Sequence, residues 1–226
     1  MKWYETRTLY KHNVGIVKNY SDIQYKISVL KTMRQAGFED IRGRVQKGSV
    51  NTEKLDNNIA RARSTIYELA ICNPWEYFCT FTIDGNKFGR YDLHAYHKSF
   101  ATWLRNYNRL HECSIKYLLV PEQHVDGAWH EHGFFMGLPA GDLVSFAEYT
   151  KRKLPDYIRK KVSAGEEIYN WEAYEHKFGW CDIEPIRNRS AAAKYVTKYI
   201  SKGLEDTCIE VNAKLYYCSK GLKRAE

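Results

Sequence analysis

The sequence predicts an α+β fold, in which an antiparallel sheet of about five strands carries packed helices and follows a helical N-terminal segment. Two observations predict it. Short runs rich in β-branched and aromatic residues alternate with stretches whose apolar residues recur every three or four positions. The runs are joined by turns or by single helical stretches, which favours antiparallel pairing. With 226 residues and a hydrophobic fraction of 44%, the chain can build one large core.

Each expected element has its own signal in the sequence. Strands are expected where β-formers cluster, at residues 77–83, 115–120, 129–136, 180–186 and 215–218. Helices are expected where the apolar period is helical, at residues 93–107, 142–163, 170–178 and 190–202.

The N-terminal segment, residues 1–73, is expected to hold two helices. Ser21-Asp22-Ile23-Gln24 has the spacing of a capping box, and apolar residues then recur at helical spacing as far as Gly37. A second amphipathic stretch runs from Leu55 to Leu69 and is closed by Asn73-Pro74. We therefore place a boundary after residue 73 and expect the sheet domain to span residues 74–226.

Charge and cysteine content bound the environment and the partners. The net charge is +8, distributed as +6 over residues 1–70, −1 over 71–138 and +3 over 139–226. Positive charge on both sides of a near-neutral middle suits a polyanion, and 18 tyrosines could stack on bases. The six cysteines form no CxxC pair and no zinc-finger spacing. With no signal peptide and no long apolar run, they favour a reducing cytoplasm, with no membrane partner.

His130-Glu131-His132 has the pattern of half a metal site. On a strand, residues two apart point to one face, so both imidazoles can bind one ion. Glu122 is the leading third ligand, and His124 is a reserve ligand or a group that contacts substrate. These ligand types also suit zinc or iron, so they do not name the metal.

The loop between these residues decides whether Glu122 can join the histidines. A two-residue Asp126-Gly127 turn would place Glu122 opposite Glu131, on the wrong face. A three-residue loop, Val125-Asp126-Gly127, would place Glu122 opposite His130, with Gly127 in the left-handed conformation. We favour the second register, although Asp-Gly also suits a two-residue turn.

A tyrosine-rich helix is expected after the strand at 180–186. Tyr195 and Tyr199 are four residues apart and share a face. Three lysines form a neighbouring row, and two apolar residues give a separate stripe for docking on the sheet: Lys194, Lys198 and Lys202; Val196 and Ile200.

Together these segments resemble the HUH endonucleases, in particular the rolling-circle replication initiators of small phages, plasmids and circular-DNA viruses. The resemblance rests on Phe78-Cys79-Thr80-Phe81-Thr82, on the segment from Glu122 to His132, and on the segment from Tyr195 to Lys202. It covers about residues 75–220 and implies a ferredoxin-like or RRM-like Rep fold. Glu131 departs from it, because the family usually has an apolar residue there. Glu131 would face away from the metal and would need solvent or a cationic partner.

The resemblance implies an enzyme that nicks and rejoins single-stranded DNA at a replication origin. Mg²⁺ or Mn²⁺, held by His130, His132 and Glu122, would polarise the scissile phosphate. A tyrosine would attack phosphorus and leave a 5′-phosphotyrosine, with Tyr199 acting first and Tyr195 second or as a positioning residue. Two groups of cations would contact DNA: Lys198 and Lys202 as catalytic cations, and Arg187, Arg189 and Lys194 as backbone contacts.

The resemblance also implies the cytoplasm of a bacterial host as the location. Gly43 to Gly48 has the glycine spacing of a phosphate loop, but Ser49 stands where lysine is required. We therefore expect no ATPase, and a host helicase and polymerase as partners.

Three alternatives remain open at this point. One is another HUH branch, a single-strand transposase or a relaxase. A second is a DNA-binding module with a structural metal and no cleavage. The third is a zinc hydrolase with Glu131 as general base, which would turn over without a covalent intermediate.

Overall fold

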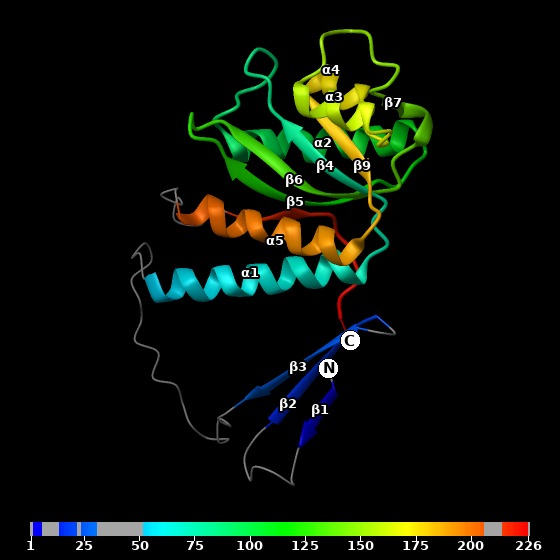
Figure 1. Ribbon diagram of the computed structural model, residues 1–226. Helices are drawn as coiled ribbons and strands as arrows, with labels where there is room; N and C mark the ends of the chain where they lie inside the picture. Colours follow the sequence, from blue (N-terminus) through cyan, green and yellow to red (C-terminus); the bar gives the residue numbers. More distant parts are fainter. Residues whose placement is uncertain (1, 6–13, 22–23, 31–51, 206–213, 226) are drawn as a thin grey trace.

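A computed structural model describes residues 2–5, 14–21, 24–30, 52–205 and 214–225 (Figure 1). It confirms the predicted α+β class. A seven-stranded antiparallel sheet has the order β10-β5-β6-β4-β9-β8-β7, and a smaller sheet has the order β1-β2-β3. Two long helices, α1 (Thr52–Cys72) and α5 (Arg189–Glu205), lie between the two sheets in Figure 1.

The five predicted strands all form in the large sheet. They are β4 (Tyr77–Thr82), β5 (Lys116–Gln123), β6 (Trp129–Met136), β9 (Cys181–Pro185) and β10 (Tyr217–Cys218). Two short strands, β7 (Leu143–Ser145) and β8 (Tyr169–Trp171), extend the sheet beyond β9.

The stretch 142–163 was predicted to be one helix, and that prediction is wrong for its first half. Residues Ala140–Asp142 form a single 3₁₀ turn that leads into β7, and helix α3 spans only Asp156–Ser163. Pro155 sets the start of α3, because its fixed φ suits the residue before a first turn while its missing N–H cannot serve a helix interior. The predicted helix at 170–178 forms as α4 (Glu172–Lys177).

One face of the large sheet is covered by α2 (Leu93–Leu110), as predicted. Asp92 caps this helix by accepting a hydrogen bond of 2.8 Å from the Ala95 N–H. Phe100 of α2 is fully buried against side chains such as Phe81 and Phe135, which alternate along β4 and β6. This aromatic core contains no proposed ligand.

The opposite face carries α1 and α5. Ile66 and Leu69 of α1 and Val196 of α5 are buried against Val120 and Phe134 of the sheet. The predicted helix at 55–69 is therefore confirmed and packs on this face. Because Phe134 lies two residues after His132, the histidines belong to the same face as α5.

The helix predicted from Ser21 onward is wrong. β2 (Val14–Ser21) and β3 (Gln24–Leu30) pair antiparallel, and β1 (Lys2–Glu5) pairs with β2. The β-branched and aromatic residues of these strands decide the local structure, and the four residues that resemble a capping box instead include the end of one strand and the start of the next. The N-terminal segment therefore contains a small sheet in addition to α1.

Residues 217–225 return to the N-terminal part of the chain. β10 pairs with β5, and the Asn73 side chain both donates to the Lys223 carbonyl (3.1 Å) and accepts from the Lys223 N–H (2.8 Å). Glu68 of α1 accepts from the Ala225 N–H at 3.2 Å. These contacts fasten the C-terminal segment to α1.

Two further expectations concern the chain as a whole. Gly43 to Gly48 lies outside the described residues. Among the helices that the structure describes, none is at once long enough and apolar enough to cross a bilayer.

Candidate functional site

The β5–β6 hairpin has the predicted three-residue loop. Glu122 pairs with His130, and Gln123 pairs with Trp129. The His124 N–H donates to the Ala128 carbonyl at 2.8 Å, and Gly127 has φ of +82°. A side chain at that φ is strained, so glycine suits the position. The two-residue register is thus excluded, and Glu122 lies on the histidine face.

Glu122 and His132 contact each other directly. The His132 Nε2–H donates to Glu122 Oε2 at 2.9 Å, and each residue is only 9% exposed. Neighbouring ligands of an octahedral ion at 2.0–2.1 Å are separated by about 3 Å, so the two atoms already have a spacing that Mg²⁺ would accept. Binding an ion there would require the proton on Nε2 to move to Nδ1 or to leave.

His130 lies beside this pair in a neutral state. Burial, followed by the charges of His124 and His132, lowers the pKa of His130 to about 4. The His124 ring stacks on it with centroids 4.0 Å apart, and His130 Nδ1 lies 3.1 Å from the Thr82 hydroxyl. A neutral imidazole is the form that binds metal, so His130 needs no deprotonation at neutral pH.

The predicted ligands therefore fit a divalent cation by donor chemistry. In the part of the chain that the structure describes, no three His, Cys, Asp or Glu side chains surround a common point. Glu122 and His132 are in place, and His130 or His124 would complete the set by rotating its ring.

Glu131 points to the other face and has a buried partner. It is 0% exposed, and His97 of α2 contacts its Oε1 through Nε2. The Tyr217 ring covers His97 with centroids 3.2 Å apart. The partner that Glu131 needs is thus His97, and Glu131 as a general base at the metal is contradicted by the register.

The predicted tyrosine helix is α5. Ala193 and Val196 are buried against the sheet, whereas Tyr195 is 50% exposed and its ring meets the Phe78 ring at 5.5 Å. Tyr199 and Lys202 lie in the same helix, but their side chains and that of Ile200 lie outside the described set.

The course of α5 relates the tyrosines to the histidines. The Ile186 N–H bonds to the Glu76 carbonyl, so α5 begins near the start of β4, and its C-terminal end lies on the side where β5 ends (Figure 1). Phe78, which Tyr195 contacts, pairs with Phe134, two residues from His132. One helical turn advances about 5.4 Å, and two strand residues span about 6.6 Å. Tyr199 therefore lies near the level of His132.

The predicted cations fall into two groups. Arg187 lines a cavity together with Tyr195, and Arg189 is exposed at the start of α5. Lys194 and Lys198 are exposed on another side of α5 and line a separate groove against α1. The structure therefore brings Arg187 to Tyr195 but not Lys198.

The cavity beside Tyr195 contains an acid that the sequence analysis missed. Its volume is about 570 Å³, and its walls include Thr80, Asp182 and Arg187. Asp182 is 5% exposed, and its pKa is raised to about 7 by burial and then by Glu184, against the lowering effect of Lys161. The signal was available, because alternation along 181–185 places Asp182 and Glu184 on one face.

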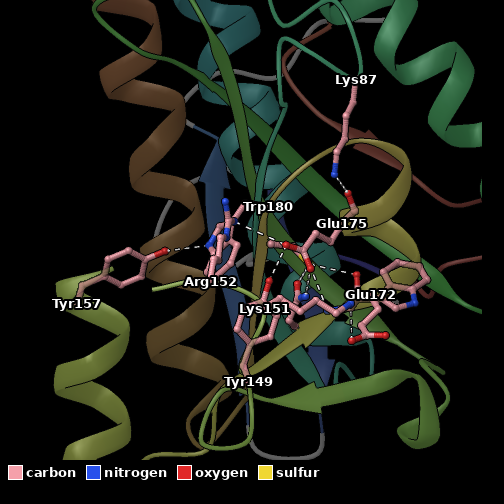
Figure 2. Close-up of polar contacts among 11 residues, drawn as sticks. Lys87, Tyr149, Lys151, Arg152, Tyr157, Glu172, Glu175 and Trp180 are labelled. Carbon is pink, nitrogen blue, oxygen red and sulfur yellow. Dashed lines mark hydrogen bonds and ion pairs between the residues drawn. The ribbon is translucent and has the colours of Figure 1, made fainter. Parts of the chain in front are cut away.

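A polar network supports the outer wall of this cavity (Figure 2). Tyr157 donates to Asp182 Oδ1 at 3.4 Å and accepts from Trp180 Nε1 at 3.4 Å. Arg152 lies over the Trp180 ring at 3.8 Å and within 3.8 Å of Glu175 Oε1. Glu175 also accepts from the Tyr149 hydroxyl at 2.8 Å. The network ties the segment before α3 to α4 and β9.

Replacing Asp182 with asparagine is expected to flatten the pH dependence of stability. The folded carboxyl keeps its proton up to about pH 7, whereas the unfolded one loses it near pH 4. In that interval the folded state binds more protons, so stability is full at the acid end and falls as the pH rises. Between pH 5 and pH 8 the wild type should lose about 2–3 kcal/mol more than Asp182→Asn.

Urea unfolding of both proteins at the two pH values measures this difference, in which all other titrating groups cancel. Asp156→Asn, an exposed acid on α3, is the matched control and should behave as the wild type. Parallel pH profiles for wild type and Asp182→Asn would show that Asp182 is ionised in the folded protein at pH 5.

Comparison with known protein families gives one match. A family model described as a replication-associated protein of the ORF2 type matches residues 76–204, more than half of the chain. The matched range holds β4, the β5–β6 hairpin, the cavity with Asp182, and α5 up to Leu204. No curated protein and no solved structure matches the chain. The matched range contains every residue of the candidate site, and the chain belongs to this family of replication-associated proteins.

Proposed function

We propose that this replication protein is a metal-dependent tyrosine endonuclease, which nicks and rejoins one DNA strand at a replication origin. The observation that carries the proposal is the register of the β5–β6 hairpin. It places Glu122, His130 and His132 on the sheet face that α5 covers, and α5 carries both tyrosines. The resemblance to HUH endonucleases and the family match support a replication role over transposition or conjugative transfer.

In the proposed reaction, a tyrosine oxygen forms a bond to phosphorus while the bond to the 3′ oxygen breaks. The 5′ end stays on the protein as a phosphotyrosine, and the 3′ oxygen leaves as a hydroxyl after taking a proton. Mg²⁺ or Mn²⁺, held by Glu122, His132 and His130, would supply Lewis-acid polarisation of the phosphate. Attack by the 3′ hydroxyl reverses the step and rejoins the strand without a nucleotide cofactor.

The residues around Tyr195 suit proton transfer. Asp182 lines the same cavity, and a carboxyl with a pKa of about 7 is matched to a proton acceptor at neutral pH. Arg187 in the same cavity offers a fixed positive charge to a phosphate. We assign the first attack to Tyr199, with Lys202 and Lys198 neutralising phosphate, and the second attack to Tyr195. Arg189 and Lys194 hold the DNA backbone.

A covalent-capture assay tests the proposal. The protein is incubated with labelled circular single-stranded DNA and Mn²⁺ and then run on a denaturing gel. A labelled protein band is expected, and it should disappear with chelator and in the Tyr195→Phe/Tyr199→Phe double variant. The single variants then identify the tyrosine that attacks first.

Tyr91→Phe is the matched control, because Tyr91 is 62% exposed and lies outside α5. It should retain the labelled band. If DNA is bound tightly but no band forms on DNAs that include the native origin, the protein is a DNA-binding module without cleavage. A band that survives in the double variant would also contradict the assignment.

A further inference from the structure

A second hollow lies on the other side of α5 from the Tyr195 cavity, and we call it the α1–α5 groove. It has a volume of about 680 Å³ and is bounded by β2–β3, α1 and α5. Its lining includes four cationic side chains and no Asp or Glu among the described residues: Lys26, Arg63, Lys194 and Lys198. Such a lining attracts phosphate groups.

The groove is formed by the docking of the small sheet on α1. Lys18 of β2 makes an ion pair with Glu68 at 2.9 Å, and Gln24 donates to the Tyr67 hydroxyl at 2.8 Å. The Tyr20 and Tyr67 rings meet edge to face with centroids 5.9 Å apart. Glu68 is buried and engaged by Lys18, so its charge does not face the groove cations as a free carboxylate.

The groove also presents an aromatic ring to solvent. Tyr25 on β3 is 63% exposed and lies next to Lys26 on the same wall. Exposed tyrosines among lysines are typical of surfaces that bind single strands, because a base can stack on the ring while cations hold the backbone. Duplex DNA keeps its bases stacked internally and would not use the ring in this way.

We propose that the α1–α5 groove binds single-stranded DNA, with a base stacked on Tyr25 and phosphates held by Lys26, Lys194 and Lys198. The inference rests on the proposed function for the identity of the strand. Since α5 separates the groove from the Tyr195 cavity, a strand that crosses α5 contacts both. The small sheet, which lies outside the range matched by the family, thereby adds a binding surface next to the site.

Binding is measured with a labelled 12-nucleotide oligothymidine in chelator, which separates it from any cleavage. Tyr25→Ala is expected to weaken binding about tenfold, within the range for loss of one stacked base. Lys26→Gln is expected to weaken binding and to reduce the slope of log K against log salt by about 0.7, as for one lost phosphate contact.

Two matched controls should leave the affinity within about twofold. Ile27→Ala changes a residue of the same strand that is 60% exposed and does not line the groove. Lys98→Gln removes an exposed charge from α2, on the other face of the large sheet. Unchanged affinity in Tyr25→Ala and Lys26→Gln overturns the proposal, and so does an equal loss on a 12-base-pair duplex.

The capture assay keeps this inference separate from the proposed function. If the variants bind weakly while the wild type forms no covalent band, the groove binds DNA and the endonuclease proposal fails. If the wild type forms the band while the variants bind oligothymidine normally, the endonuclease stands and the groove assignment fails.

Discussion

Replacing Glu131 with leucine, while His97 is kept, is expected to lower the free energy of unfolding by about 3–5 kcal/mol. Both residues are buried, with His97 5% exposed and Glu131 fully enclosed. The substitution leaves a buried imidazole that loses the carboxylate it contacts. His97 Nδ1 has no hydrogen-bond partner within the described residues, so no other contact offsets this loss.

Replacing both partners tests whether the cost comes from the broken pair. Glu131→Leu combined with His97→Phe is expected to recover most of the stability, because apolar residues of similar volume can replace a buried polar pair at little cost. Urea unfolding of the two single variants and the double variant measures the coupling. Glu148→Leu, at an exposed position, should stay within about 0.5 kcal/mol of the wild type. A double variant as unstable as the first single variant would assign the cost to packing.

Gly133→Ala is expected to destabilise the protein by about 3 kcal/mol or more, beyond the usual cost of overpacking. A Cβ at this position would lie 1.9 Å from the Leu118 carbonyl oxygen and 2.9 Å from the Leu119 Cα. Both are backbone atoms of β5, so the two strands would have to separate. Glycine in a strand often marks such a close approach of two backbones.

Thermal unfolding measures this effect, and a loss of 3 kcal/mol corresponds to a fall in Tm of about 6–12 °C for a chain of this size. The matched control is Gly141→Ala, where nothing lies within 4 Å of the added Cβ and the backbone has no positive φ. An unchanged Tm for Gly133→Ala would mean that β5 and β6 are not paired as described. Because His132 adjoins Gly133, weaker metal binding should accompany the loss of stability.

Local signals predicted the hairpin that carries the candidate ligands. The two-residue period placed His130 and His132 on one face, and Gly127 identified the loop that aligned Glu122 with them. The helical period likewise predicted α1, α2 and α5. In each case a few neighbouring residues carry the whole signal, so no distant contact was needed.

Features that depend on distant segments could not be predicted. His97 and Glu131 are 34 residues apart, and nothing in either segment names the other as its partner. The cavity around Asp182 is built from β4, α3, β9 and α5. The capping-box spacing at Ser21 misled because a four-residue motif cannot outweigh the strand preference of the residues on either side and the pairing of β2 with β3.

The contacts between α1 and residues 223–225 have a consequence for the order of folding during synthesis. Asn73 and Lys223 are 150 residues apart, and Glu68 and Ala225 are 157 apart. A ribosome makes the N-terminal partner of each pair long before the other, so α1 leaves the exit tunnel with these two side chains still waiting for their acceptors and donors. The last turn of α1 can therefore reach its final arrangement only after the C-terminal segment has emerged.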